Sequence, residues 1–223
     1  MASSHLKRIV APKTWPILRK TTKFIARPKP SGQKMELTMP VVVVIREQLG
    51  LVQTSAQARK ILHAQPITVN GKRVYDTDSA VGFMDVLSVG GKQYRMLINQ
   101  NNNLYLAPAH EELVLQKVGG KNTLPKGRTQ LACTSGRTVI VDKDTYKTGD
   151  SIALGKDGKV AGHYPFVVGA CVLLTGGNHI GKVGTVVKVD GKTIIIKTDG
   201  QEIQTATTHA FVIGKDKPAI SLK

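Results

Sequence analysis

Cysteine is scarce in this chain, which has 223 residues and two cysteines, Cys133 and Cys171. The two form no CxxC pair, and no histidine stands near either of them at metal-ligand spacing. We therefore expect two buried, small hydrophobic side chains in a reducing cytoplasm. The sequence predicts no disulfide, no metal site and no cofactor.

Long hydrophobic runs are also missing, since the longest aliphatic run, Val41 to Ile45, has five residues. A membrane-spanning helix needs roughly 20. The first residues lack the apolar segment of a secretory signal, and their prolines would interrupt the amphipathic helix of a transit peptide. We expect a cytoplasmic protein without a membrane partner.

Residue groupings typical of enzymes are absent. The six histidines form no HxxH or HExxH pattern, and no serine lies in a G-x-S-x-G turn. Adjacent Glu111 and Glu112 would point apart in regular structure, so we interpret them as surface charges. The ten aromatic residues are scattered and form no platform on which bare single strands could stack. We predict neither catalysis nor a small-molecule substrate.

Positive charge is what the chain has in excess. Lys and Arg number 32 against 15 Asp and Glu, a formal net charge of +17. Such a charge needs a polyanionic partner, with nucleic acid the first candidate because neutralised phosphates release counterions. An anionic membrane surface is the second candidate.

The excess charge is concentrated at the start of the chain, where residues 1–40 carry nine Lys or Arg and one acidic residue. With four prolines before Gly32 and few large apolar residues, this segment is predicted to form no core of its own. We expect a basic arm that becomes ordered on a partner, with Trp15 and Phe24 as anchors. A solubilising tail is the alternative.

A helix and a hairpin follow. Thr54 and Gln57 form a capping-box pattern, and apolar residues recur on one helical face as far as Leu62. Asn70-Gly71 between two short β-branched runs predicts a hairpin with a type I′ turn. The pair of elements would hold four basic side chains on a rigid backbone: Arg59, Lys60, Lys72 and Arg73.

From Gly90 onward, glycine-containing turns separate short runs of Val, Ile, Thr and Leu, which predicts sandwiches or barrels and no parallel βαβ sheet. One glycine-rich loop, residues 175–184, follows a predicted strand. Its glycines permit positive φ and close approach to a sugar-phosphate backbone. Gly176 to Lys182 also fits the GxxxxGK part of a nucleotide-binding loop, but Val183 replaces the required Ser or Thr, so we reject nucleotide binding.

Two segments resemble known RNA-associated modules. SAQARKILHAQPITVNGKRV, followed by VGFMDVLSV, is similar to the S-four-type RNA-binding module. That resemblance implies a helix over Val41–Leu49, although the β-branched run alone favours a strand. VGACVLLTGGNHIGKVGTVVKVDGKTIIIK resembles the KOW motif of ribosomal proteins and transcription elongation factors.

The opening run HLKRIVAPKTW, His5 to Trp15, resembles the start of the S-four-E family of archaeal and eukaryotic small-subunit ribosomal proteins. The modules also occur in that family's order. The family usually has Gly-Pro-His after the arm, whereas this chain has Ser31-Gly32-Gln33, so the resemblance supports no base contact by a histidine there. Because the chain stops at Lys223 without a basic tail, we expect an archaeal-type member.

The resemblance implies an α+β, mostly β, multi-domain fold. We expect an extended basic arm (1–40), a small αβ S-four-type RNA-binding domain (41–100), a central β domain (101–167) and a KOW-type small β-barrel (168–223). The implied partners are small-subunit ribosomal RNA and neighbouring ribosomal proteins. The predicted RNA-binding residues are Lys7, Arg8, Lys13, Trp15, Arg19, Lys20, Lys23, Arg27, Lys29, Lys34, Arg59, Lys60, Lys72, Arg73, Asn178, His179, Gly181, Lys182 and Gly184.

Two other functions remain open at this stage. S-four-type modules are often attached to RNA-modifying enzymes such as pseudouridine synthases, which would need a large catalytic domain. KOW segments also occur in transcription elongation factors, which would need a polymerase-binding domain.

Overall fold

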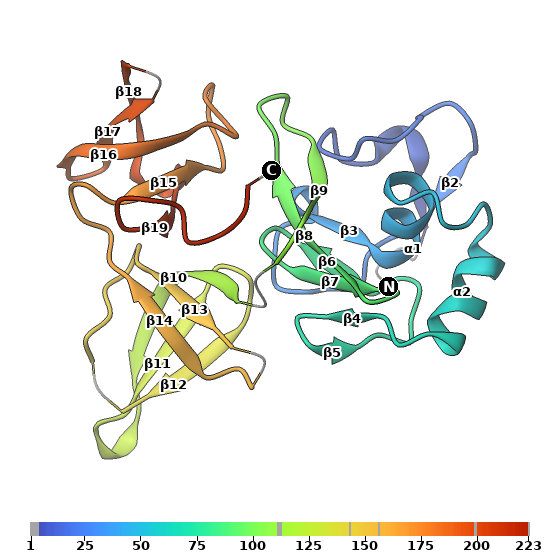
Figure 1. Cartoon of the computed structure of the whole chain (residues 1–223), viewed down its shortest axis with the longest axis horizontal. Helices are drawn as coiled ribbons and strands as arrows, with labels where there is room; N and C mark the ends of the chain where they lie inside the picture. Colours follow the sequence, from blue (N-terminus) through green and yellow to red (C-terminus); the bar gives the residue numbers. More distant parts are fainter. Residues whose placement is uncertain (1–4, 111–112, 143, 156, 199, 223) are drawn as a thin grey trace. The chain divides into compact units, whose positions relative to one another are not determined.

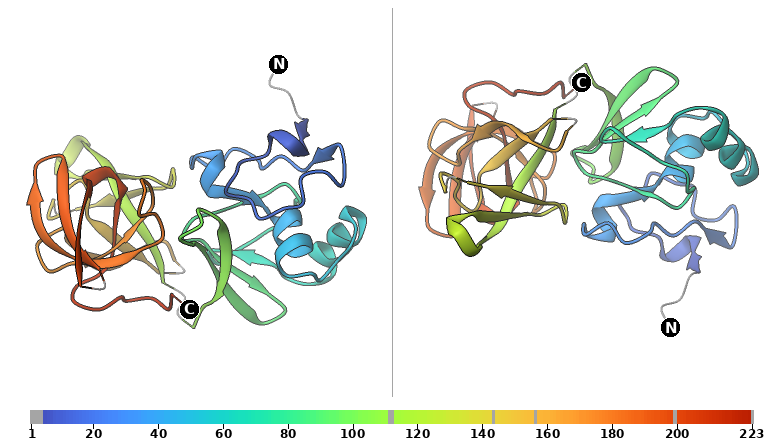
Figure 2. Two further views of the ribbon diagram at one scale, coloured as in Figure 1. Left: turned by 90° about the horizontal axis from the view of Figure 1, so that it is seen from above. Right: turned by 90° about the horizontal axis from the view of Figure 1, so that it is seen from below.

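The computed structural model describes residues 5–110, 113–142, 144–155, 157–198 and 200–222. Two compact units are present: the first holds the residues up to Leu97 with Asn102–Ala109, and the second holds Ile98–Asn101 with the residues from His110 onward. Both consist mainly of antiparallel strands, with few helices (Figures 1 and 2). The expected mostly β fold class is confirmed.

The first unit contains three small sheets. The larger one has the strand order β5-β4-β7-β8-β9, and the two others are the pairs β1-β2 and β3-β6. Their strands are β1 (Leu6–Lys7), β2 (Phe24–Ile25), β3 (Thr38–Pro40), β4 (Thr68–Val69), β5 (Lys72–Arg73), β6 (Ala80–Gly82), β7 (Val86–Val89), β8 (Lys92–Ile98) and β9 (Leu104–Pro108). The helical segments are η1 (Arg8–Val10), η2 (Met35–Leu37), α1 (Val41–Val43), η3 (Val44–Gln48) and α2 (Ser55–Ala64).

The aliphatic run after Pro40 is helical, as the resemblance to the S-four-type module implied. The β propensity of its residues alone had favoured a strand. The run forms one turn of α-helix, α1, continued by the π-helical η3. The first two amides, of Val41 and Val42, donate to the backbone oxygens of Ser79 and Thr77, which satisfies donors that a helix start leaves free. Val41 to Ile45 are at most 1% exposed, so burial on all sides overrides the local preference for a strand.

The segment before Pro40 is packed onto these elements, which corrects the expectation of an arm without a core. Trp15 is 2% exposed, and the amide of Leu104 donates to the oxygen of Thr14 over 2.8 Å. The side-chain amide of Gln33 accepts from the backbone N–H of Phe83 and donates to its oxygen. The segment cannot build a core alone, but it contributes side chains to the core formed by residues distant in sequence.

The Asn70-Gly71 hairpin has the predicted turn, since Asn70 and Gly71 have φ values of 53° and 78°. Asn70 is buried, and its side chain donates to Asp85 over 2.7 Å and accepts from the N–H of Val86. The other oxygen of Asp85 accepts from the amide of Gly82. These bonds fix the short hairpin to β7, so strands β4 and β5 need no large core of their own.

The second unit contains two five-stranded antiparallel sheets, ordered β12-β11-β10-β13-β14 and β18-β17-β16-β15-β19. The first consists of β10 (Val114–Thr123), β11 (Thr129–Cys133), β12 (Thr138–Val141), β13 (Ser151–Leu154) and β14 (Val160–Tyr164), with η4 (Pro125–Gly127) between β10 and β11. The second consists of β15 (Cys171–Leu174), β16 (Val183–Asp190), β17 (Thr193–Thr198), β18 (Gln201–Ala206) and β19 (Ala210–Gly214), with η5 (Thr207–His209) before β19.

Each sheet of the second unit has its own aliphatic core. Val118, Leu131 and Ile152 centre the first, and Val172, Ile194 and Ile196 centre the second. Buried residues alternate with more exposed ones along β17, the period expected of a strand covered on one face. Both cysteines are buried free thiols, and burial raises the pKa of Cys133 to about 11. The prediction of small buried hydrophobic cysteines is confirmed.

Lys117 of β10 connects the two sheets. Its ammonium group donates to the backbone oxygens of Thr207, Thr208 and Ala210 over 3.4, 3.0 and 2.6 Å. Burial lowers the pKa of Lys117 to about 8, because the charged form loses water. Three carbonyl dipoles replace that water, so the cation joins β10 to η5 and β19.

We predict that Lys117→Met lowers the free energy of unfolding of the protein by about 1–3 kcal/mol, because three carbonyl oxygens lose their donor, two of them in partly buried bonds. Urea denaturation would measure the change. The matched control is Lys121→Met in the same strand, where an exposed lysine pairs with Asp144 over 2.8 Å. Exposed pairs contribute at most about 1 kcal/mol, so equal losses in both variants would contradict the bridging role.

Candidate RNA-binding surfaces

Seven of the ten predicted residues of the N-terminal segment have exposed side chains: Lys7, Lys13, Lys20, Lys23, Arg27, Lys29 and Lys34. Lys29 forms an exposed ion pair with Asp76, and the ammonium of Lys23 lies 5.5 Å from the ring centre of Phe24. Glu36 is the segment's one acidic residue. The exposed cations therefore make a predominantly positive surface, which we call the N-terminal surface.

Arg8 and Trp15 are not part of that surface, which corrects their predicted role. The Arg8 guanidinium donates to Leu18 O, to Thr22 Oγ1 over 3.2 Å and to Glu47 Oε1 over 2.7 Å. Its side chain is 5% exposed. A buried cation needs such partners, because an unpaired charge loses its hydration without compensation. Arg8 thus fastens the N-terminal segment to η3.

Glu47 is the partner that sequence patterns did not reveal. Burial alone would raise its pKa, but hydrogen bonds and charge attraction from Arg8 and then Arg46 outweigh burial, and the pKa of this carboxyl is lowered. Arg19 also has an internal role, since it is half-buried and donates to the backbone oxygens of Ala11 and Pro12 over 2.6 and 2.7 Å.

The second surface, called here the helix-hairpin surface, comprises Arg59 and Lys60 of α2 with Lys72 and Arg73 of β5. All four side chains are exposed. The predicted capping box starts α2, with the Thr54 hydroxyl accepting from Gln57 N and Gln57 Oε1 accepting from Thr54 N. Arg73 donates to the backbone oxygen of His63 over 3.4 Å, which joins the hairpin to the last turn of the helix.

The third surface is the β15–β16 loop, residues 175–182. Asn178 is exposed, while His179 and Lys182 are half-buried. Backbone bonds from Leu174 N to Lys182 O and from Gly181 N to Leu174 O hold the loop over 3.0 and 2.8 Å. The loop is therefore a fixed support for the three predicted donors.

The glycines of this region serve the protein's own packing. A Cβ on Gly181 would meet the Gln100 amide nitrogen of the same unit at 2.6 Å, and Gly181 has a φ of 75°. Gly184 is buried within β16, and a Cβ there would meet the oxygen of Lys197 at 2.6 Å. Close approach of the chain to itself therefore already explains why both positions lack a side chain. Gly184 is buried, and contact of RNA with the half-buried backbone of Gly181 stays a prediction.

The β10–β14 region has further exposed basic side chains that belong to no sequence motif: Lys121 in β10, and Arg128, Lys147 and Lys159 between strands. The positive balance of residues 121–167 was the available signal. Among the described residues, no cluster of His, Cys, Asp and Glu could hold a metal ion. No helix in the described part of the chain is long and apolar enough to cross a membrane.

Comparison with known proteins connects these features to one family. The small ribosomal subunit protein eS4 of Methanocella arvoryzae is 36% identical over 99% of this chain and 98% of its own length. This chain belongs to the S4e family of ribosomal proteins. The eS4 protein of Methanothermobacter thermautotrophicus is 34% identical over the whole chain and 97% of its own length. The match is therefore to archaeal members, as expected.

Family descriptions and a solved structure agree with this membership. Residues 2–31 match the RS4NT (NUC023) domain, and residues 90–158 match Ribosomal family S4e. The crystal structure of the 30S ribosomal protein S4e from Thermoplasma acidophilum has a TM-score of 0.70 and 31% identity, covering 80% of this chain and 96% of that chain. Residues 90–158 overlap most of the expected central domain (101–167), where short motifs had given no information.

Membership in a family of ribosomal proteins decides between the functional classes left open by the sequence. The S4e chain is a ribosomal protein and not an enzyme. Neither the pseudouridine synthase nor the elongation factor alternative agrees with relatives that match along essentially the full length.

The Arg8–Glu47 contact yields a pH-dependent prediction. Because the folded-state pKa of Glu47 is lowered, its contribution to stability is complete above the ordinary value of 4.5 and is lost as pH falls through the folded pKa. Glu47→Gln should lower the free energy of unfolding by about 2 kcal/mol at pH 7, since charge-assisted bonds are lost. Wild type and variant should converge as pH falls below 4.5, as followed by denaturation at several pH values.

Glu36→Gln is the matched control, since Glu36 is an exposed carboxylate of the same unit. Its stability difference from wild type should stay near zero across the same pH range. A Glu47→Gln difference that is independent of pH would show that the ion pair does not hold the segment.

Proposed function

We propose that this S4e chain is a structural constituent of the small ribosomal subunit that binds and organises folded ribosomal RNA. The observation that supports this proposal is that a member of a ribosomal protein family has exposed cations on its N-terminal and helix-hairpin surfaces. Contacts between such cations and phosphates fix the position and orientation of a protein on its nucleic acid. Neighbouring ribosomal proteins are the other proposed partners.

The module assignments belong to the same proposal. Residues 41–100 are proposed as an S-four-type RNA-binding domain, supported by the capped helix α2 followed by the Asn70-Gly71 hairpin. Residues 168–223 are proposed as a KOW-type barrel, supported by the five-stranded sheet and the fixed β15–β16 loop. Residues 101–167 are the proposed central β domain, and 1–40 the basic segment.

Recognition is proposed to rest on phosphate, sugar and shape. Ten aromatic residues occur in 223, and Trp15 is buried, so stacking on aromatic rings has little surface available. The exposed cations of the N-terminal and helix-hairpin surfaces can instead neutralise phosphates of folded RNA. Sedimentation of the tagged protein tests the assignment to the subunit: we expect it with small subunits at physiological salt, and free protein would contradict it.

A charge-removal experiment tests the N-terminal surface. Deletion of residues 1–34 would also remove buried Trp15, so substitution is the cleaner design. Lys7→Gln, Lys13→Gln and Lys20→Gln together should weaken binding to a small-subunit rRNA transcript and reduce the salt slope of log affinity by as much as about 3, roughly one per lost phosphate contact. Filter binding at several salt concentrations measures both quantities.

The control carries the same loss of charge elsewhere. Lys188, Lys192 and Lys197 are exposed lysines of the β16–β17 region, outside the proposed surfaces. Their triple Gln variant should retain most of the wild-type slope. Equal slopes in the two triple variants would indicate non-specific attraction and would contradict a defined N-terminal surface.

A further inference from the structure

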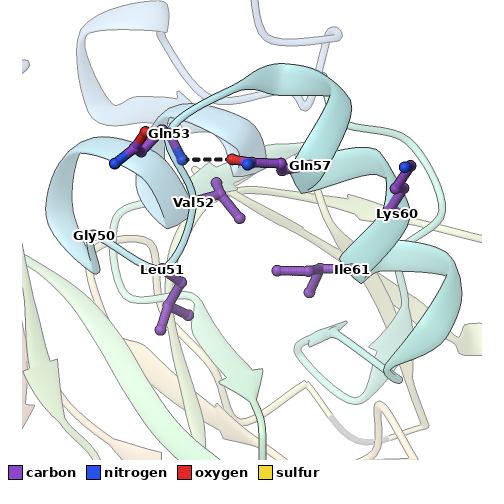
Figure 3. A pocket seen from close by; sticks show the side chains of 7 residues that line it. All are labelled: Gly50, Leu51, Val52, Gln53, Gln57, Lys60 and Ile61. Carbon is purple, nitrogen blue, oxygen red and sulfur yellow. Dashed lines mark hydrogen bonds between the residues drawn. The ribbon is translucent and has the colours of Figure 1, made fainter.

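A pocket of about 460 Å³ lies in the first unit between the η3–α2 connection and α2 (Figure 3). It is lined by Gly50, Leu51, Val52, Gln53, Gln57, Lys60 and Ile61. Its size falls within the range of about 300–1,000 Å³ that is usual for pockets holding small organic groups. None of the lining residues is acidic.

The walls of the pocket are aliphatic. Leu51 is 54% exposed, whereas the next residue, Val52, is 6% exposed and anchors the connection. In Figure 3 the side chain of Ile61 points from α2 toward the segment that carries Leu51 and Val52. Leu51 and Ile61 are thus the aliphatic side chains that the pocket offers to a ligand from its two walls.

The polar group at the pocket is held in one orientation. Gln57 Oε1 accepts from the backbone amides of Gln53 and Thr54 over 2.9 and 3.1 Å. Because both partners are N–H donors, the side-chain oxygen must face them, and the amide NH2 group faces away from the backbone cap. The capping box thus fixes the orientation of the Gln57 amide, whose NH2 group is left to donate to a ligand or to water.

The pocket rim is positive. Lys60 lines it, and the adjacent Arg59 is exposed on the same helix. The described part of the chain supplies no ion-pair partner for Lys60. An apolar wall, fixed N–H donors and a cation together complement a flat group with acceptor atoms on its edge and an anion attached to it.

We infer that this pocket receives one unpaired nucleobase of the bound RNA, with its face against Leu51 and Ile61, its acceptor edge toward the Gln57 amide and its phosphate near Lys60. The inference rests on the proposed RNA-binding function and adds a base contact to surfaces otherwise built for phosphates. An apolar side chain from a protein partner would use neither the Gln57 donors nor the Lys60 charge, whereas a nucleotide uses both, so the nucleobase is the better match.

The test separates base from phosphate contacts through their salt dependence. Leu51→Ala should weaken binding to a small-subunit rRNA transcript by about 3- to 10-fold with an unchanged salt slope, because apolar contacts release no counterions. Lys60→Gln should weaken binding and lower the slope by about 1. Ile140→Ala, which trims an exposed isoleucine of β12, is the matched control and should change neither quantity.

These outcomes also distinguish this inference from the proposed function. A wild-type protein that fails to bind the transcript would refute the proposed function. Wild-type binding with a normal salt slope, combined with no effect of Leu51→Ala, would refute only the pocket assignment. Leu51→Ala and Lys60→Gln both change exposed side chains, and an unaltered thermal unfolding midpoint would confirm that the two variants are folded.

A crosslinking experiment identifies the occupant directly. A photoreactive benzophenone amino acid at position 51, in the full chain assembled into small subunits, should crosslink to one nucleotide that is unpaired in the rRNA. Sequencing of the adduct locates it. Crosslinks to a protein, or to nucleotides within base-paired helices, would overturn the inference.

Discussion

Repulsion among 32 cationic side chains is the constraint on which the rest of this structure depends. Each compact unit buries only modest aliphatic cores, so little stability is available to oppose a large net charge. Most of the charges are accordingly displayed on exposed side chains of the N-terminal segment, of loops, of short strands and of one short helix. A polyanion would relieve this repulsion on binding, which is why the same feature that burdens the free protein favours its proposed place among rRNA phosphates.

A few cations are used inside the protein. Arg8 joins the N-terminal segment to η3 through Glu47, and Lys117 joins the two sheets of the second unit through three carbonyl oxygens. Arg8 holds a segment that has no core of its own, and Lys117 connects two sheets whose separate cores are small. Counting basic residues therefore overestimates the number available to RNA, and burial with its hydrogen-bond partners separates structural cations from those that can bind phosphate.

Local patterns were reliable where short-range physics decides the outcome. The capping box of Thr54 and Gln57 and the turn of Asn70-Gly71 formed as predicted, because each involves bonds or dihedral angles within four residues. Val41 to Ile45 show the opposite case, since burial from several distant segments favours a helix over the strand that their β-branched side chains prefer alone. The resemblance to known modules supplied what propensity could not.

The sequence by itself determined the mostly β class, the family and the excess of positive charge, since composition, turn signals and motif order are properties of the chain. Only the tertiary structure decided that Arg8 and Trp15 are internal and that Gly181 and Gly184 serve close packing. The pocket beside Leu51 likewise requires a loop and a helix to meet. The internal positions of Arg8 and Trp15 depend on contacts between residues that are far apart in sequence. The pocket depends on how residues 50–61 fold back on themselves, and no local pattern encodes either outcome.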